Sequence, residues 1–197
     1  MTAGEENNFM NIREIVKILK PENEVESAIV AESEFIEGCN YGKPRSGHPE
    51  GKVIFHVYEV LRNVEKYSDS SNRDDLRAIA LVHDTFKYQV DKTKPKVGEN
   101  HHGYFARKFL DRFVSNISVL EVTELHDEGY NSWCDIKRKG VETANARAIN
   151  LADRLSESNS IGLYLKFYRC DNETGNKEKE NFLWFNQMLR ERGYTID

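Results

Sequence analysis

Histidines and neighbouring carboxylates are the residues of this chain best suited to chemistry. All six histidines lie between residues 48 and 126. Imidazole nitrogens suit divalent ions such as Mn, Fe, Co, Ni and Zn, and carboxylates add charge and can bridge two ions. A bound ion lowers the pKa of its water and makes a hydroxide near neutral pH. These residue types therefore indicate a divalent-metal centre with hydrolytic chemistry.

The first two candidate ligands lie on the apolar sides of two predicted helices. His56 falls within a stripe of valines and leucines in the helix predicted over residues 52–67. His83 shares a face with Leu76 and Ile79, and Asp84 follows it directly. Apolar stripes at this spacing face the core of a globular protein. We therefore expect both imidazoles to point inward.

Three further helical patterns repeat this arrangement. His101 and His102 stand one turn before an apolar run, His126 ends another run, and Asp153 lies one turn after Ile149. A single histidine on an apolar face is more often a hydrogen-bonded core residue than a ligand. Several buried imidazoles and carboxylates facing one core, however, need a common partner, because unpaired buried polar groups are costly. The convergence favours a metal ion as that partner.

Two further candidates receive a different interpretation. Asp127 opens the polar stretch DEGYNS and is predicted to be a solvated residue at a helix end. His48 lies in a loop rich in glycine and proline over residues 38–51 and is expected to be structural or exposed.

The elements that must position these residues are helices. Apolar residues recur at spacings of three and four, and strand alternation is scarce. The predicted helices cover residues 10–20, 24–37, 52–67, 73–88, 100–113, 119–126, 141–155 and 181–192. Residues 161–170 fit either a strand or a short buried helix. No repeat or linker divides the chain, so we predict one all-α domain over residues 1–197.

Composition narrows the class of protein. The chain has 28 Lys and Arg against 33 Asp and Glu, a net charge of −5, which disfavours long nucleic acid as a partner. Its three cysteines form no CxxC pair, and no apolar run reaches the about 18 to 20 residues of a membrane span. We therefore expect a cytoplasmic protein without a membrane partner. Phosphate-loop, dinucleotide and serine-hydrolase motifs are absent.

The order of the candidate ligands resembles the HD-domain metal-dependent phosphohydrolases in their H, HD, H, H, D form. The stretches GHPEGKVIFHVYEVL, ALVHDTFK and NLADRLS are similar to helices that carry ligands in that family. The resemblance covers about residues 47–156. It implies an HD-domain helical bundle whose metal-site core spans that range, with helical extensions at both ends.

Carried over residue by residue, the resemblance implies a site for one or two ions, with Mg added to the ions named above. One ion would be held by His56, His83, Asp84 and Asp153, and Asp84 would bridge to a second. That second site would take His126 and either His101 or His102. Ala106 lies five residues after His101, where the family has alanine, which favours His101, and both histidines stay candidates.

The resemblance implies hydrolysis of a small phosphate substrate, with a nucleotide or related phosphate ester favoured, by a metal-activated water. Asp84 and Lys87 are the catalytic candidates, and Lys87, Arg154, Lys43 and Arg45 are candidates for binding the phosphate. Two alternatives stay open: a non-catalytic nucleotide-binding or regulatory HD module, and a phosphodiesterase acting on a cyclic nucleotide or dinucleotide. The sequence leaves both a monomer and a homo-oligomer open.

Overall fold

The regular structure of this protein is helical. A computed structural model describes residues 9–44, 51–175 and 179–194, and within these ranges it contains no strand. The fold is all-α, as predicted. In chain order the elements are α1 (Ile12–Leu19), α2 (Glu24–Ala31), α3 (Ser33–Cys39), α4 (Val53–Tyr67), α5 (Arg73–Val82), η1 (Lys87–Gln89), η2 (Gly98–Asn100), α6 (His102–Leu110), α7 (Ile117–Leu125), α8 (Glu128–Lys139), α9 (Val141–Glu157), α10 (Ile161–Asn172) and α11 (Glu180–Glu191).

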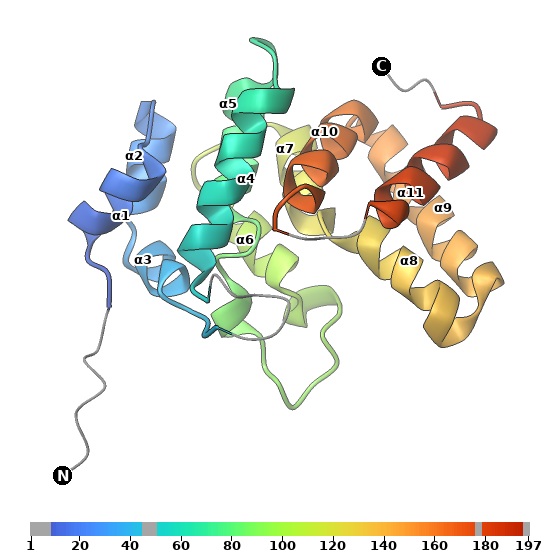
Figure 1. Cartoon of the computed structure of the whole chain (residues 1–197), viewed down its shortest axis with the longest axis horizontal. Coiled ribbons are helices and arrows are strands. Elements are labelled where there is room, and N and C mark those ends of the chain that lie inside the picture. The colour runs from blue at the N-terminus through green and yellow to red at the C-terminus, as the bar shows by residue number, and fades with distance from the viewer. Residues whose placement is uncertain (1–8, 45–50, 176–178, 195–197) are drawn as a thin grey trace.

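The helices form a central group with a smaller group at each end (Figure 1). Helices α4, α5, α7 and α10 pack on one another in the middle, and α6 packs on α7. The short helices α1–α3 cover one end, where α1 and α3 pack on α4 and α2 packs on α5. Helices α8, α9 and α11 lie at the other end, with α8 packed on both α9 and α11. Chain segments far apart in sequence therefore meet in the central group.

One apolar core draws side chains from every α-helix of the described ranges except α8. Helix α5 is buried almost throughout, from Leu76 to Val82, because neighbouring helices cover it on several sides. Helix α4 buries one face, with Ile54, Val57 and Val60 fully inside. His56 and His83 belong to these buried stretches, so the packing of the core itself fixes the direction of both imidazoles.

Two glycines allow backbones to approach closely beside the histidines. A Cβ on Gly38 would lie 1.9 Å from the backbone oxygen of Thr85, the residue after Asp84. A Cβ on Gly103 would lie 2.2 Å from the backbone oxygen of Glu124 in α7. Only a residue without a side chain fits such contacts. The Gly103 contact draws the start of α6, which carries His102, against the end of α7.

The boundaries differ from the predicted ones in three places. The helix predicted over residues 24–37 is two helices, because Glu32 takes an extended conformation with ψ of 133°. The helix predicted to reach residue 88 ends at Val82, and the chain then makes tight turns in which Thr85 bonds back to Val82 and Lys87 to Asp84. The stretch that starts at Asp127, predicted as a polar loop, leads into helix α8.

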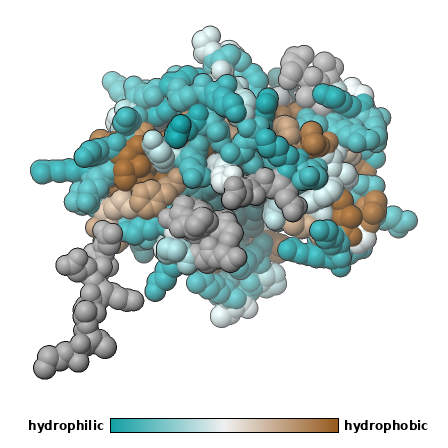
Figure 2. Space-filling model, in the orientation of Figure 1, coloured by the Kyte–Doolittle hydropathy of each residue, from teal (hydrophilic) through white to brown (hydrophobic). Residues whose placement is uncertain are grey.

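Residues 161–170, for which a strand and a helix were both open, belong to α10. That helix continues to Asn172 and buries Tyr164, Phe167 and Tyr168 on one face. None of the helices in the described ranges has the length and apolar character that a membrane crossing requires. Figure 2 shows a largely hydrophilic face, with apolar side chains gathered near the N-terminal helices and at the opposite end.

Candidate metal centre

Asp84 lies at the middle of the histidine cluster. It is buried, and it stands in the turn where the chain leaves α5. Its Oδ2 lies 3.4 Å from His56 Nε2 and 3.8 Å from His83 Nε2. Its Oδ1 lies 3.3 Å from His102 Nε2 and 3.5 Å from His126 Nε2. Each carboxylate oxygen therefore faces a different pair of imidazoles.

The two histidine pairs come from four different helices or helix ends. His56 on α4 and His83 at the end of α5 bring their Nε2 atoms within 3.2 Å, and we name this pair with Asp84 Oδ2 the first half. His102 on α6 and His126 at the end of α7 bring theirs within 3.1 Å, and we name this pair with Asp84 Oδ1 the second half. In each half the ligand atoms lie within 4.8 Å of one another.

Hydrogen bonds to the backbone fix which nitrogen of two rings carries the proton. His83 Nδ1 donates to the carbonyl oxygen of Ala80 at 2.9 Å, and His126 Nδ1 donates to that of Thr123 at 2.9 Å. In a neutral imidazole the other nitrogen then has a lone pair. In the neutral form of each ring the Nε2 lone pair therefore points into the cluster, as in histidines that ligate metals.

The electrostatics of the cluster also suit a cation. Burial lowers the pKa of His83 to about 3 and that of His102 to about 4, so both rings are neutral near pH 7. Burial also opposes the charged form of His126, but Asp84 and Asp127 outweigh it and raise its pKa to about 8. The carboxylates thus attract positive charge to the second half. A metal ion bound there would displace the proton of His126.

A second carboxylate, that of Asp171 near the end of α10, adjoins the first half. Its Oδ1 lies 3.0 Å from His56 Nε2. Asp171 is not among the ligands predicted from the sequence. A signal for it was present, because Asp171 follows Tyr164 and Phe167 at helical spacing on the buried face of α10. That signal depended on recognising residues 161–172 as one helix.

Asp153, predicted to supply this carboxylate, lies elsewhere. It is exposed on α9, and its Oδ1 accepts a hydrogen bond from the hydroxyl of Tyr194 at 3.2 Å. The buried face of α9 carries Ala148, Ala152 and Leu155, and Asp153 lies off that face. The prediction that Asp153 points into the core is therefore wrong.

His101 and His102 take different positions. His102 is the one that contacts Asp84, although the position of Ala106 favoured His101. His101 caps α6, because its Nδ1 accepts a hydrogen bond from the backbone N–H of Gly103 at 3.1 Å. Its Nε2 lies 3.3 Å from Asp127 Oδ2, so Asp127 is a partner of this histidine and not the solvated residue that the sequence suggested.

The predicted phosphate-binding cations are separated in the structure. The ammonium of Lys87 forms an ion pair with Asp84 and so stands at the cluster. Arg154 instead forms ion pairs with Glu121 at 2.6 Å and Glu124 at 3.1 Å. These carboxylates neutralise the positive charge that was predicted to bind a phosphate. Lys43 is exposed in the loop before α4. Arg45 and His48 lie outside the described residues.

The donor set fits divalent transition ions. Four imidazoles and the carboxylates of Asp84 and Asp171 combine the nitrogen and oxygen ligands that such ions prefer, and Asp84 can bridge two of them. Without a cation, the lone pair on His83 Nε2 faces His56 Nε2 3.2 Å away, and His126 Nε2, which lies 3.1 Å from His102 Nε2, keeps a proton that a metal ion would replace. The cluster of His56, His83, Asp84, His102 and His126 is therefore compatible with a metal site.

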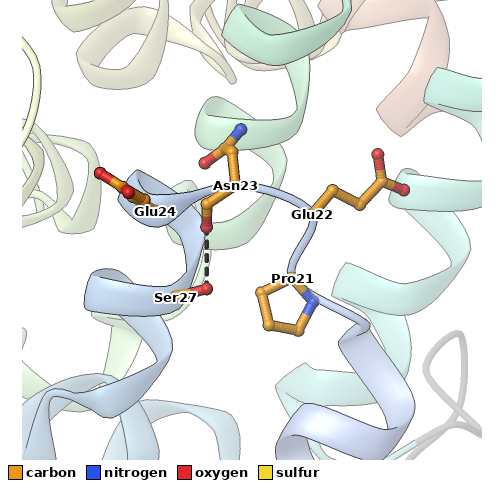
Figure 3. Close-up of a pocket in the computed structure, with 5 residues that line it drawn as sticks. All are labelled: Pro21, Glu22, Asn23, Glu24 and Ser27. Atoms are coloured by element: carbon orange, nitrogen blue, oxygen red, sulfur yellow. Dashed lines mark hydrogen bonds between the residues drawn. The ribbon is translucent and has the colours of Figure 1, made fainter.

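A surface pocket near the N-terminal helices contains no histidine and differs from the metal centre. It lies between α1 and α2 and is lined by Pro21, Glu22, Asn23, Glu24 and Ser27 (Figure 3). Ser27 Oγ donates to the backbone oxygen of Asn23 at 2.8 Å, and Glu22 pairs with Arg73. These contacts pair Ser27 and Glu22 within the fold.

Comparison with known proteins gives one match. The family model described as HD domain matches residues 53–158, which are 106 of the 197 residues. The matched range contains both histidine pairs and Asp84, includes Asp153 and ends before Asp171. No curated protein and no solved structure matches the chain.

Proposed function

We propose that this chain, which belongs to the HD domain family, is a metal-dependent phosphohydrolase that acts on a nucleotide or a related small phosphate ester. Membership supports the general class, a metal-dependent hydrolase. The nature of the substrate is our proposal. It rests on the resemblance of the site to phosphohydrolases and on the net charge of −5, which disfavours a long polyanion.

One observation carries the proposal, namely the position of Asp84 between two histidine pairs. A core histidine that serves packing alone needs one hydrogen-bond partner, and His83 and His126 already have theirs in backbone carbonyls. Their second nitrogens nevertheless converge with His56 and His102 on the two oxygens of a single carboxylate. Such convergence has no packing advantage, because buried polar groups cost free energy unless they are satisfied.

Each residue of the cluster has a role under this proposal. His56, His83, Asp84 and Asp171 would hold one divalent ion, and Asp84, His102 and His126 would hold a second. Ions bound there would lower the pKa of coordinated water and stabilise negative charge on a phosphoryl group. Lys87, which pairs with Asp84, stands where its ammonium can neutralise charge on a substrate phosphate. Lys43 and Arg45 remain proposals for binding the phosphate.

The test is a phosphate-release screen on the purified chain, with elemental analysis of its metal content. Nucleotides and cyclic nucleotides are offered with Mn, Co, Ni, Zn or Mg, or without added metal. We expect release that requires a divalent metal and that is lost in Asp84→Ala and His83→Ala. Circular dichroism should show that both variants keep their helical content.

Three results would overturn or redirect the proposal. Full turnover in either variant would remove these residues from the site. Bound metal or nucleotide without turnover on any substrate would instead favour a non-catalytic nucleotide-binding module. Turnover confined to cyclic nucleotides or dinucleotides would redirect the proposal to a phosphodiesterase.

A further inference from the structure

Asp127 and His101 adjoin the second half of the cluster without belonging to the H, HD, H, H, D pattern. The ligand atoms of His101, His102 and Asp127 lie within 4.8 Å of one another. Asp127 Oδ2 lies 3.3 Å from His101 Nε2 and 3.9 Å from His102 Nε2. Because Asp127 directly follows His126, its backbone is fixed at the end of α7, next to a candidate ligand.

The proton on His101 can be placed from its cap. Its Nδ1 accepts the backbone N–H of Gly103, so in the neutral ring the hydrogen is on Nε2. His101 Nε2 therefore donates to Asp127 Oδ2 and has no lone pair there for a metal. This makes His101 a residue that orients the Asp127 carboxylate, as outer partners orient the ligands of metal sites.

The other oxygen of Asp127 lacks a partner. Oδ1 is buried and has no hydrogen-bond partner among the described residues. Asp127 stands at the N-cap position of α8, yet its side chain makes no cap hydrogen bond, so capping does not explain its orientation. A buried carboxylate oxygen without a partner costs free energy, and a nearby cation would remove that cost.

The two halves become equivalent once Asp127 is included. The first half has two histidines, one oxygen of Asp84 and the carboxylate of Asp171. The second half has two histidines, the other oxygen of Asp84 and, beside His102, the carboxylate of Asp127. Each half would then have one carboxylate of its own in addition to the shared one.

We propose that Asp127 is a further residue of the metal centre, supplying a carboxylate to a cation in the second half, and that His101 is its positioning residue. This inference rests on the proposed function, because it requires that the cluster binds divalent ions. It assigns to the second half a negative charge that the family pattern does not include.

The test measures metal binding and not turnover. Metal-free full-length chain is titrated with MnCl₂ by isothermal titration calorimetry, and bound Mn is counted by elemental analysis. Asp127→Asn keeps the shape of the side chain and removes its charge. Asp111→Asn, an exposed carboxylate at the end of α6, is the matched control. We expect two equivalents in the unmodified chain and in the control. In Asp127→Asn, we expect the affinity for the Mn ion bound by the first half (the first equivalent) to be unchanged. We expect the affinity for the ion bound by the second half (the second equivalent) to be weakened about 10- to 100-fold.

A second variant keeps the inference testable if Asp127→Asn is unstable. Asn is a favoured N-cap residue, so His101→Asn retains the cap of α6 but is too short to reach Asp127. We expect it also to weaken the second equivalent selectively.

The outcomes separate this inference from the proposed function. No bound Mn in the unmodified chain would overturn both. A single equivalent in the unmodified chain, two unweakened equivalents in the variants, or equal weakening of both equivalents in a folded variant would overturn the inference alone.

Discussion

Asp84 is the residue that unites the two halves of the cluster. Burial alone would raise its pKa, but the charge of Lys87 and hydrogen bonds from His102 and His126 outweigh burial and hold the pKa of this carboxyl well below its usual range. Asp84 is therefore ionised near neutral pH even before a metal binds. An amide of the same shape would lack the charge that two cations need from a shared ligand.

The first prediction concerns Asp171 and Asp153. Asp171→Asn should weaken binding of the first equivalent of Mn about 10- to 100-fold, because this carboxylate contacts His56 inside the cluster. Asp153→Asn should leave Mn binding unchanged, since Asp153 is exposed and bonded to Tyr194. Calorimetric titration of both variants measures this. Weakened Mn binding in Asp153→Asn, with unchanged binding in Asp171→Asn, would instead identify Asp153 as the ligand.

The second prediction concerns Lys87. Lys87→Ala should retain its metal and lose about 10²-fold in kcat, because an ammonium beside Asp84 would no longer offset charge on the transferred group. Lys94→Ala is a matched control, since Lys94 pairs with Asp91 at the same spacing of three residues in an exposed turn. Equal rates in the two variants would assign Lys87 to the surface.

The sequence predicted the histidines of the cluster better than its carboxylates. His56, His83 and His126 lie on strongly apolar stripes, and their burial followed from periodicity. Asp171 and Asp127 stand at helix ends, where a carboxylate is usually solvated. Periodicity places Asp171 on a buried face only once residues 161–172 are read as one helix, and the position of Asp127 depends on tertiary contacts. The choice between His101 and His102 depended on one residue of register, because His101 caps α6 and His102 begins it.

At the scale of elements, a buried ion pair attaches α2 to α5. Arg77 Nε and Nη2 donate to the two oxygens of Glu26 at 2.7 and 2.8 Å, and both residues are almost fully buried. Nη2 also lies 3.2 Å from the backbone oxygen of Lys20, at the end of α1. One guanidinium of the central helix α5 thus joins both α1 and α2 to it.

The third prediction follows from this pair. Arg77→Met should lower the free energy of unfolding by about 3–5 kcal/mol, because it leaves the Glu26 carboxylate buried and unpaired. Arg73→Met removes a more exposed pair with Glu22 and Glu65 and should cost at most about 1 kcal/mol. Urea unfolding followed by circular dichroism compares the two. Similarly small losses of unfolding free energy in both variants would show that apolar contacts alone hold α2 in place.

The sequence predicted the presence of helices where apolar periodicity was strong, as in α4 and α11. It predicted the residues at which helices end less accurately. The break at Glu32 follows no glycine or proline, and the two helices that it separates pack on different partners, α2 on α5 and α3 on α4. Helix α8 has a polar sequence, and its first turn is fixed by Gly129, whose N–H donates to the buried hydroxyl of Tyr164. Local sequence contains neither of these tertiary contacts.

At the scale of the whole molecule, the candidate ligands come from five helices. Helices α4, α5, α6, α7 and α10 supply or directly precede the residues of the cluster, and their sequence positions span more than a hundred residues. The sequence indicated that these residues face inward but not which helices lie side by side. That arrangement depends on packing in the central group, including the close contact at Gly103.

The fourth prediction is that metal binding stabilises the entire fold. Ligands assembled from five helices exist together only in the folded state, so an ion bound there shifts the folding equilibrium by mass action. At a free-metal concentration of 100 times Kd, the gain is about 2.7 kcal/mol, which raises Tm by roughly 5–10 °C for a chain of this size. Scanning calorimetry with excess Mn and with a chelator measures the difference. Asp84→Asn should show almost no difference between the two conditions, because it loses the carboxylate shared by both halves. A large difference in that variant would mean that the stabilising ion binds elsewhere.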